Sequence, residues 1–270
     1  MGRLWRGCQD SGRSGLGQGI ARDAIVVQTV GEVLDGAREY ARRQIAAFAR
    51  RLREPLTSAR LKLTVLTRPS VPWPALVQAN LVLDGQPIRA QVAARFVQEA
   101  SRYLRARLGA QVARLASPNV PRAWPAEGGS RIVPVPRPVG QREIARCKCH
   151  PLEECTPDRA ALVMDVMDYD FHLFVDAETG QDSVIYRVGP TGYRLARVSR
   201  VAPPSAPTSV PLTINVHPVP ELTPEQAVQR LDATELPFRF FRDTATGRGA
   251  VLYRRYDGHY GLIAPERDGG

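Results

Sequence analysis

Arginine is the residue type whose distribution in this sequence most directly indicates chemistry. The 270 residues carry a formal net charge of +10. Segment 24–116 holds 15 Lys and Arg against 6 Asp and Glu, whereas 141–270 holds 15 against 18. The planar guanidinium group donates two parallel hydrogen bonds to a phosphate. The cationic surplus of one segment therefore favours a polyanionic partner, most often nucleic acid, over a merely solvated basic face.

The candidate RNA-binding residues are the basic side chains that lie beside the apolar positions of helices and strands expected in this segment. They are Arg38, Arg42, Arg43, Arg50, Arg51, Arg60, Lys62, Arg89, Arg102, Arg105, Arg107 and Arg114. Because they fall outside the apolar stripes, we expect their guanidinium and ammonium groups to face outward.

Six elements are expected to position these side chains. The periodicity predicts strands at 25–30, 59–67, 76–83 and 88–93, a helix from about residue 32 to 53, and a second helix from about 96 to 115. Asp84-Gly85 is typical of a hairpin turn between the last two strands. The order β-α-β-β-β-α predicts a two-layer α+β domain, with both helices on one face of a four-stranded sheet.

The C-terminal half contains an internal duplication. The stretch 171–180 (FHLFVDAETG) recurs at 238–247 (FRFFRDTATG), 67 positions later and without a gap. Upstream, Thr156-Pro157 matches Thr223-Pro224, and each pair is typical of a helix start with a threonine N-cap. Each copy predicts a small β-α-β-β-β domain, with leading strands expected at 144–149 and 214–217.

The chain therefore divides into a disordered tail at 1–22, an N-terminal domain at 23–116 and a Pro/Gly-rich linker at 117–141. Repeat 1 follows at 142–200, a joint at 201–211 and repeat 2 at 212–266. The sequence has no apolar stretch long enough to span a bilayer and no apolar core of a secretory signal in its first residues. We expect a cytoplasmic protein.

Metal binding is the most specific alternative function, because the potential ligands Cys147, Cys149 and His150 lie close in sequence, with Cys155 five residues further on. Two cysteines on one face of a strand chelate poorly, and repeat 2 carries Ile214 and Val216 at the matching positions. We favour strand packing, and we predict neither a metal nor a cofactor.

No arrangement of catalytic residues stands out. Asp176 and Asp243 lie in expected turns, where an aspartate caps its own backbone, so they are poor candidates for an acid–base pair. The sequence has no Ser-His-Asp pattern and no Walker loop. We therefore predict a binding protein without a small-molecule substrate, and not an enzyme.

The residues of the second copy, 238–263 (FRFFRDTATGRGAVLYRRYDGHYGLI), resemble the C-terminal domain of the long ribosome hibernation-promoting factors. Residues 24–116 look like the ribosome-binding N-terminal domain of the same family. The first copy, 167–198 (MDYDFHLFVDAETGQDSVIYRVGPTGYRLARV), is most similar to the mycobacterial, dormancy-associated members, which also have a doubled C-terminal half.

This resemblance implies a protein that silences the ribosome by occupying the channel of the small subunit where mRNA and tRNA lie. The expected partners are 16S rRNA and ribosomal proteins. Arg107 and Arg114 fall where the family's second helix is basic. Gln44 and Ala47 stand where its first helix carries charge, with other arginines nearby.

The duplication further suggests that the two repeats pair within one chain. In ordinary long members a single C-terminal domain pairs with a copy on another molecule and joins two ribosomes. Here a joint of about 12 residues, which can reach about 40 Å, tethers the second repeat to the first. The tether gives each repeat an effective concentration of roughly millimolar around the other. We therefore expect a monomer that stabilises idle single ribosomes. The expected repeat-interface residues are Phe171, Phe174, Tyr186, Phe238, Phe241, Tyr253 and Tyr260.

Two other functions stay open at this point. One is a general RNA- or DNA-binding regulator that acts off the ribosome and binds free RNA equally well. The other is a scaffold whose C-terminal half recruits a protein partner and keeps it when residues 1–116 are deleted.

Overall fold

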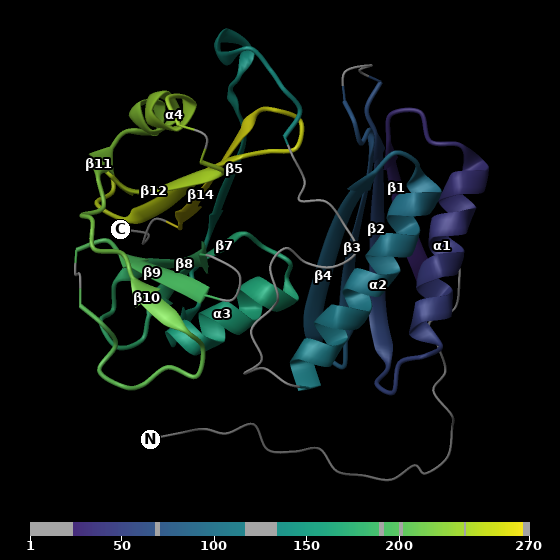
Figure 1. Ribbon diagram of the computed structural model, residues 1–270, viewed down its shortest axis with the longest axis horizontal. Coiled ribbons are helices and arrows are strands. Elements are labelled where there is room, and N and C mark those ends of the chain that lie inside the picture. The colour runs from purple at the N-terminus through teal and green to yellow at the C-terminus, as the bar shows by residue number, and fades with distance from the viewer. Residues whose placement is uncertain are drawn as a thin grey trace.

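The computed structural model describes residues 24–67, 71–116, 134–188, 192–199, 202–234 and 236–266. The N-terminal domain lies on one side of the molecule and the duplicated half on the other (Figure 1). The expected tail at 1–22 and most of the expected linker at 117–141 lie outside these residues. Within the described ranges, no helix combines the length and the apolar character that a membrane span needs.

The N-terminal domain is a four-stranded sheet with two helices on one face. Its elements are β1 (Ile25–Val30), α1 (Asp35–Ala49), β2 (Leu56–Val65), β3 (Ala75–Leu83), β4 (Gln86–Ala94) and α2 (Val97–Ala116). The strands lie in the order β1-β2-β3-β4, with β1 parallel to β2 and the other neighbours antiparallel. The predicted β-α-β-β-β-α order and α+β class are confirmed.

Strand alternation determines which side of this sheet is buried. Leu61 and Leu63 of β2 face the helices and are at most 1% exposed, whereas the alternating Arg60 and Lys62 are exposed on the other side. Ile45 of α1 belongs to the same buried cluster. Full burial of each large aliphatic side chain contributes about 1.5–3 kcal/mol, so this face holds the helices in place.

Local turn chemistry explains the ends of two elements. Asp84 and Gly85 both have positive φ, 46° and 74°, which is the geometry of a type I′ hairpin and confirms the predicted turn. Helix α1 is shorter than the expected span 32–53. The chain tightens after Ala49, where the backbone N–H of Arg51 donates to the Phe48 carbonyl at 3.0 Å.

The duplicated half repeats one series of elements. Repeat 1 contains β5 (Ile144–His150), β6 (Glu154–Cys155), α3 (Pro157–Val166), β7 (Phe171–Asp176), β8 (Asp182–Val188) and β9 (Gly192–Arg197). Repeat 2 contains β10 (Leu212–Ile214), β11 (Glu221–Leu222), α4 (Pro224–Asp232), β12 (Phe238–Asp243), β13 (Gly249–Arg254) and β14 (Tyr260–Pro265). The expected N-caps are present, since the hydroxyls of Thr156 and Thr223 each accept from the backbone N–H of the third helical residue at 3.3 Å.

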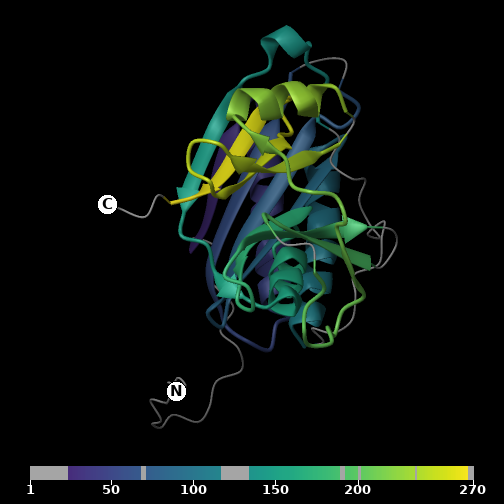
Figure 2. The ribbon, with the colours of Figure 1, turned by 90° about the vertical axis from the view of Figure 1, so that its left-hand side faces the viewer.

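The leading strand of each repeat lies in the sheet of the other repeat. Strand β5 pairs in parallel with β14, and β10 pairs in parallel with β9. The two sheets therefore have the orders β10-β9-β8-β7-β6 and β11-β12-β13-β14-β5. Figure 2 shows the teal strand β5 beside the yellow strands of repeat 2. This exchange ties the repeats together and covers an edge of each sheet.

Strand β10 covers 212–214, so the expected strand at 214–217 is wrong in its position. Asn215 ends the strand because its side chain bonds to the backbone of His217, donating to the carbonyl at 3.1 Å and accepting from the N–H at 3.4 Å. This local turn competes with sheet pairing, and Val216 within it is 71% exposed.

The two sheets pack face to face through equivalent aromatic residues. Phe171 and its counterpart Phe238 have ring centroids 4.7 Å apart. The reciprocal pairs Phe171–Tyr253 and Tyr186–Phe238 are 5.9 Å and 5.4 Å apart. Contacts in which residue i meets j and the counterpart of j meets that of i are the mark of a two-fold interface. The repeats therefore form a pseudo-dimer, as expected.

Three of the expected repeat-interface residues lie elsewhere. Phe174 is in the core beneath α3, and Phe241 and Tyr260 are in the corresponding core beneath α4. The correction follows from alternation along β7 and β12, which places Phe171 and Phe174, or Phe238 and Phe241, on opposite faces of a sheet. Each repeat thus has one core under its helix and shares a second core with its partner.

Candidate nucleic-acid interface

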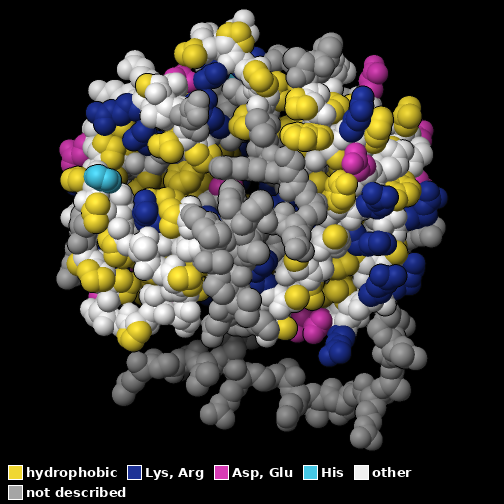
Figure 3. Space-filling model, in the orientation of Figure 1, with side chains coloured by type: hydrophobic (Ala, Val, Ile, Leu, Met, Phe, Trp, Pro, Cys, Tyr) yellow, Lys and Arg dark blue, Asp and Glu magenta, His cyan; other side chains and the backbone are white. Residues whose placement is uncertain are grey.

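Five of the predicted RNA contacts lie on helix α1 and in the turn after it. The exposed members of this group are Arg38, Arg43, Arg50 and Arg51. Arg42 is half-buried, and its Nη1 lies 3.2 Å from Oε2 of Glu39. Dark blue side chains gather on the right-hand side of Figure 3, over the helical layer of this domain. Because α1 buries its opposite side, these guanidinium groups face solvent and can reach a phosphate.

A second basic group lies on the face of the sheet that carries no helix. The register of β2, β3 and β4 aligns two rows of side chains across the strands, Arg60 with Asn80 and Arg89, and Lys62 with Gln78 and Gln91. Arg89 Nη2 donates to Oε1 of Gln78 at 3.3 Å and also to Oε1 of Gln91. Cations interleaved with amides can bond to both phosphates and base edges.

These two basic groups lie on opposite sides of the sheet. Arg43 is in the helical layer, whereas Arg60 and Lys62 project from the open face. A flat nucleic-acid surface can contact only one group at a time, while RNA that encloses the domain can contact both. The sequence predicted each group by its periodicity but not their separation.

The predicted contacts on α2 divide into two kinds. Arg102 is exposed, with its guanidinium carbon 5.9 Å from the ring centroid of Tyr103, and Arg105 is half-buried. Arg107 and Arg114 lie toward the duplicated half, where their side chains are only 13% and 14% exposed. Another part of the chain therefore competes with RNA for these two side chains.

That competitor is the segment that joins α3 to β7, together with the last turn of α3. We call Asp165, Asp168 and Tyr169 the carboxylate corner. Oδ1 of Asp168 lies 3.1 Å from Nε of Arg107, and Oδ2 of Asp165 lies 3.8 Å from Nε of Arg114. Both aspartate side chains are only 4% exposed, so these ion pairs are shielded from solvent.

The same corner also engages strand β4. Arg89 Nη1 donates to the carbonyls of Met167 and Asp168 at 3.2 Å and 3.3 Å, and its guanidinium carbon lies 5.2 Å from the ring centroid of Tyr169. Oδ2 of Asp168 accepts from the backbone N–H of Gln91 at 3.0 Å. The corner therefore seals part of the free edge of β4 and contacts a basic residue on the open face.

An aspartate organises each repeat, buried in repeat 1 and half-buried in repeat 2, and the sequence patterns pointed to neither. Asp165 accepts from the hydroxyl of Tyr193 at 2.6 Å and from Arg187. In repeat 2, Asp232 makes the matching contacts, accepting from the hydroxyl of Tyr260 and lying 3.9 Å from Arg254. Each triad recurs at the spacing of the duplication, and this is the signal that could have identified it.

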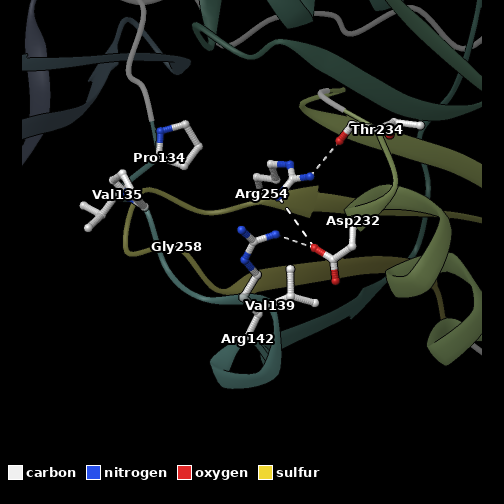
Figure 4. Close-up of a pocket in the computed structure, with 9 residues that line it drawn as sticks. Pro134, Val135, Val139, Arg142, Asp232, Thr234, Arg254 and Gly258 are labelled. Atoms are coloured by element: carbon white, nitrogen blue, oxygen red, sulfur yellow. Dashed lines mark hydrogen bonds and ion pairs between the residues drawn. The ribbon is translucent and has the colours of Figure 1, made fainter.

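Asp232 and Arg254 of the repeat 2 triad line a shallow cavity of about 330 Å³ (Figure 4). Arg142 bonds to Asp232 from the segment before β5, and Val135 and Val139 line the same cavity. Burial raises the pKa of the Tyr260 phenol, and its hydrogen bond to Asp232 raises it further. Two arginines share the Asp232 carboxylate at this cavity, and Nη2 of Arg254 also donates to the carbonyls of Leu231 and Thr234 at 2.7 Å and 2.9 Å.

His172 makes the stability of repeat 1 dependent on pH. Burial lowers its pKa to about 4 from an ordinary value near 6.5, and its Nε2 has no hydrogen-bond partner among the described residues. The unfolded chain therefore binds this proton more readily, and stability falls as pH drops from about 6.5 toward 4. We expect a loss of about 2 kcal/mol between pH 7.5 and pH 5.

Urea unfolding at these two pH values measures this loss in the wild type and in His172→Phe, which should remove it. The matched control is His217→Phe, which replaces an exposed histidine and should keep the wild-type pH dependence. An equal dependence in the His172 variant would contradict the assignment.

The cysteines do not assemble a metal site in the described part of the chain. Cys147 and Cys149 are exposed on the edge strand β5, whereas Cys155 is buried in repeat 1, and all three are free. Burial raises the pKa of the Cys155 thiol to about 11, so this thiol is inert at neutral pH. Within the described ranges, no group of three or more His, Cys, Asp or Glu side chains could hold a metal ion.

Comparison with known proteins gives a family match and two close relatives. The family model described as the C terminus of Sigma 54 modulation/S30EA ribosomal protein matches residues 140–195 and 214–262, which fall in the two repeats. Over 218 residues the chain is 44% identical to the dormancy associated translation inhibitor of Mycobacterium tuberculosis strains CDC 1551/Oshkosh and H37Rv. The match covers 78% of this chain and 77% of each relative.

Two solved structures are similar to about a third of the chain. The N-terminal domain of Thermus thermophilus Protein Y has a TM-score of 0.28 and 22% identity, and covers 34% of this chain and 97% of its own. A ribosomal subunit interface protein from Coxiella burnetii has a TM-score of 0.28 and 16% identity, and covers 34% of this chain and 99% of its own. At these values neither likeness carries a conclusion about function.

Proposed function

Because the chain belongs to the family of long ribosome hibernation-promoting factors, we propose that it binds the small ribosomal subunit and inhibits translation. The N-terminal domain would occupy the channel for mRNA and tRNA, and the action is binding, in the cytoplasm, without a catalytic step. The observation that supports this proposal is the group of exposed arginines on α1 and in the turn after it. In the same chain, the two C-terminal repeats pair with each other.

The chemistry of this surface suits folded RNA. Arg43 on α1 and Arg50 at its C-cap are seven residues apart and both exposed, so they lie on one side of the helix and can bond to neighbouring phosphates. Binding through phosphates releases counterions, so affinity should fall steeply with salt, with a slope of about −0.7 to −0.9 for each neutralised phosphate. Ribosomal RNA offers such phosphates in a fixed arrangement.

The duplicated half supports action on single ribosomes. The surface that would join two molecules is already used inside the chain, where Phe171 meets Phe238 and the leading strands are exchanged. A second molecule therefore finds no free copy of this interface. We propose a monomer that silences and stabilises idle single ribosomes rather than joining them in pairs.

Sucrose-gradient sedimentation of ribosomes with the purified protein tests this function. We expect the protein to migrate with the small subunit and with single ribosomes at physiological salt, to leave them at high salt, and to reduce translation in a cell-free reaction. A new peak of ribosome dimers would contradict the single-ribosome proposal. Equal competition by free RNA at fixed salt would favour a general RNA-binding protein instead.

A further inference from the structure

Three arginines of the N-terminal domain are held by repeat 1 rather than left for solvent. Arg107 pairs with Asp168, Arg114 lies beside Asp165, and Arg89 bonds to the backbone of the same corner. Two of these side chains are about one-seventh exposed, whereas Arg38 and Arg43 of α1 are exposed. The cationic surface of the domain is thus partly covered by the molecule itself.

The contact is selective for repeat 1, and the duplication shows why. In repeat 2, Asp232 has a second arginine partner beside Arg254, because Arg142 reaches it from the segment before β5. The counterpart of Arg142 before β10 is Ser209, which supplies no cation to Asp165. Arg114 of α2 occupies that role. Asp165 therefore lacks the second arginine that the segment before β5 supplies to Asp232, and Arg114 of the N-terminal domain takes its place.

Carboxylate and phosphate compete for the same hydrogen-bonding fork of a guanidinium group. An arginine that is buried against an aspartate cannot bind RNA until the pair opens. Opening exposes both charges to water, which compensates for most of the lost attraction. It also exposes Val166, which is 4% exposed within the apolar core of the N-terminal domain, so the closed form is favoured. The chain between Ala116 and Pro134 can span about 60 Å when extended, so it permits the separation.

We propose that the carboxylate corner of repeat 1 is an internal docking site for the RNA-binding arginines, and that RNA must displace it. This inference rests on the proposed function, since it assigns a regulation to the same surface. The free protein is then mostly closed, with Arg89, Arg107 and Arg114 masked. Ribosomal RNA selects the open form, in which the three arginines join those of α1. An RNA whose binding free energy is smaller than the free energy of opening leaves the protein in the closed form.

The test changes Asp168, whose backbone has a φ of 54°. Both Asp168→Asn and Asp168→Gly suit this left-handed conformation and remove the charge, so the fold should be kept. If the closed form is populated to about 80–90%, releasing it raises the apparent affinity for a short fluorescent RNA hairpin about five- to tenfold. The matched control is Asp170→Asn, which makes the same change of charge at an exposed position two residues away.

Two readouts separate this proposal from the proposed function. Hydrogen exchange in the free protein should accelerate at the Gln91 amide, which donates to Asp168, in both Asp168 variants and not in Asp170→Asn. Hairpin affinity equal to that of the wild type in both Asp168 variants would overturn the docking site. Ribosome sedimentation is scored separately. If the hairpin affinity rises but no variant sediments with ribosomes, the proposed function fails and the docking site stands.

Discussion

Arg43→Glu combined with Arg50→Glu is expected to weaken binding to the small ribosomal subunit about a hundredfold. Each exposed guanidinium group that bonds to a phosphate contributes about 1.5 kcal/mol, and reversal adds repulsion between the new carboxylate and the same phosphate. The two side chains are exposed, on α1 and at its C-cap, so their replacement should change the stability of the fold by no more than about 0.5 kcal/mol each. Co-sedimentation at a series of salt concentrations measures the effect.

The salt dependence distinguishes direct contact from a change in overall charge. Losing two phosphate contacts should reduce the slope of log affinity against log salt by about 1.5. The matched control is Arg159→Glu with Arg230→Glu, which makes the same charge change at exposed positions of the two repeats. If this control weakens binding as much as the α1 variant, α1 is not the contact surface.

Phe238→Ala is expected to lower the free energy of unfolding by about 3 kcal/mol. The side chain packs against Phe171 at 4.7 Å and Tyr186 at 5.4 Å between the two sheets, and its removal leaves a cavity in their shared core. Because this core is the only apolar contact between the faces of the two sheets in the described residues, the loss should also make the duplicated half prone to pair with other molecules.

Urea unfolding measures the stability change, and sedimentation velocity at several protein concentrations measures association. Phe96→Ala is the matched control, since Phe96 is 61% exposed and its replacement should change stability by no more than about 0.5 kcal/mol. Equal stability of Phe238→Ala and the wild type would show that the sheets do not depend on this contact. In that case the exchanged strands and the Asp182–Arg248 ion pair hold the repeats together.

Local patterns in the sequence predicted the fold class well, because each is set by neighbours along the chain. Alternation in β2 separated Leu61 from Arg60, Asp84-Gly85 specified a hairpin through its positive φ angles, and Thr156 and Thr223 capped their helices. The duplication was visible because equivalent residues stand at a constant offset. The alternation, the turn and the caps each depend on a few neighbouring residues, and the duplication shows as a constant spacing. None of these signals needs tertiary information.

The candidate site was only partly predictable for the same reason. Helical periodicity placed Arg107 and Arg114 outside the apolar stripe of α2. Periodicity shows only which side of a helix packs against its own domain. It could not reveal that another part of the chain covers them with Asp168 and Asp165. An exposed arginine and one buried in an ion pair have the same local pattern, and only their distant partners distinguish them.

The sequence by itself determined the elements, the duplication and the cationic character of the N-terminal domain, because these depend on residue type and spacing. Only the tertiary structure decided that β5 joins β14 and β10 joins β9, and which arginines remain free for RNA. The physical reason is that the two repeats present nearly the same strand edges. Pairing within a repeat and pairing between repeats satisfy the same local preferences, and the packing of the whole chain selects between them.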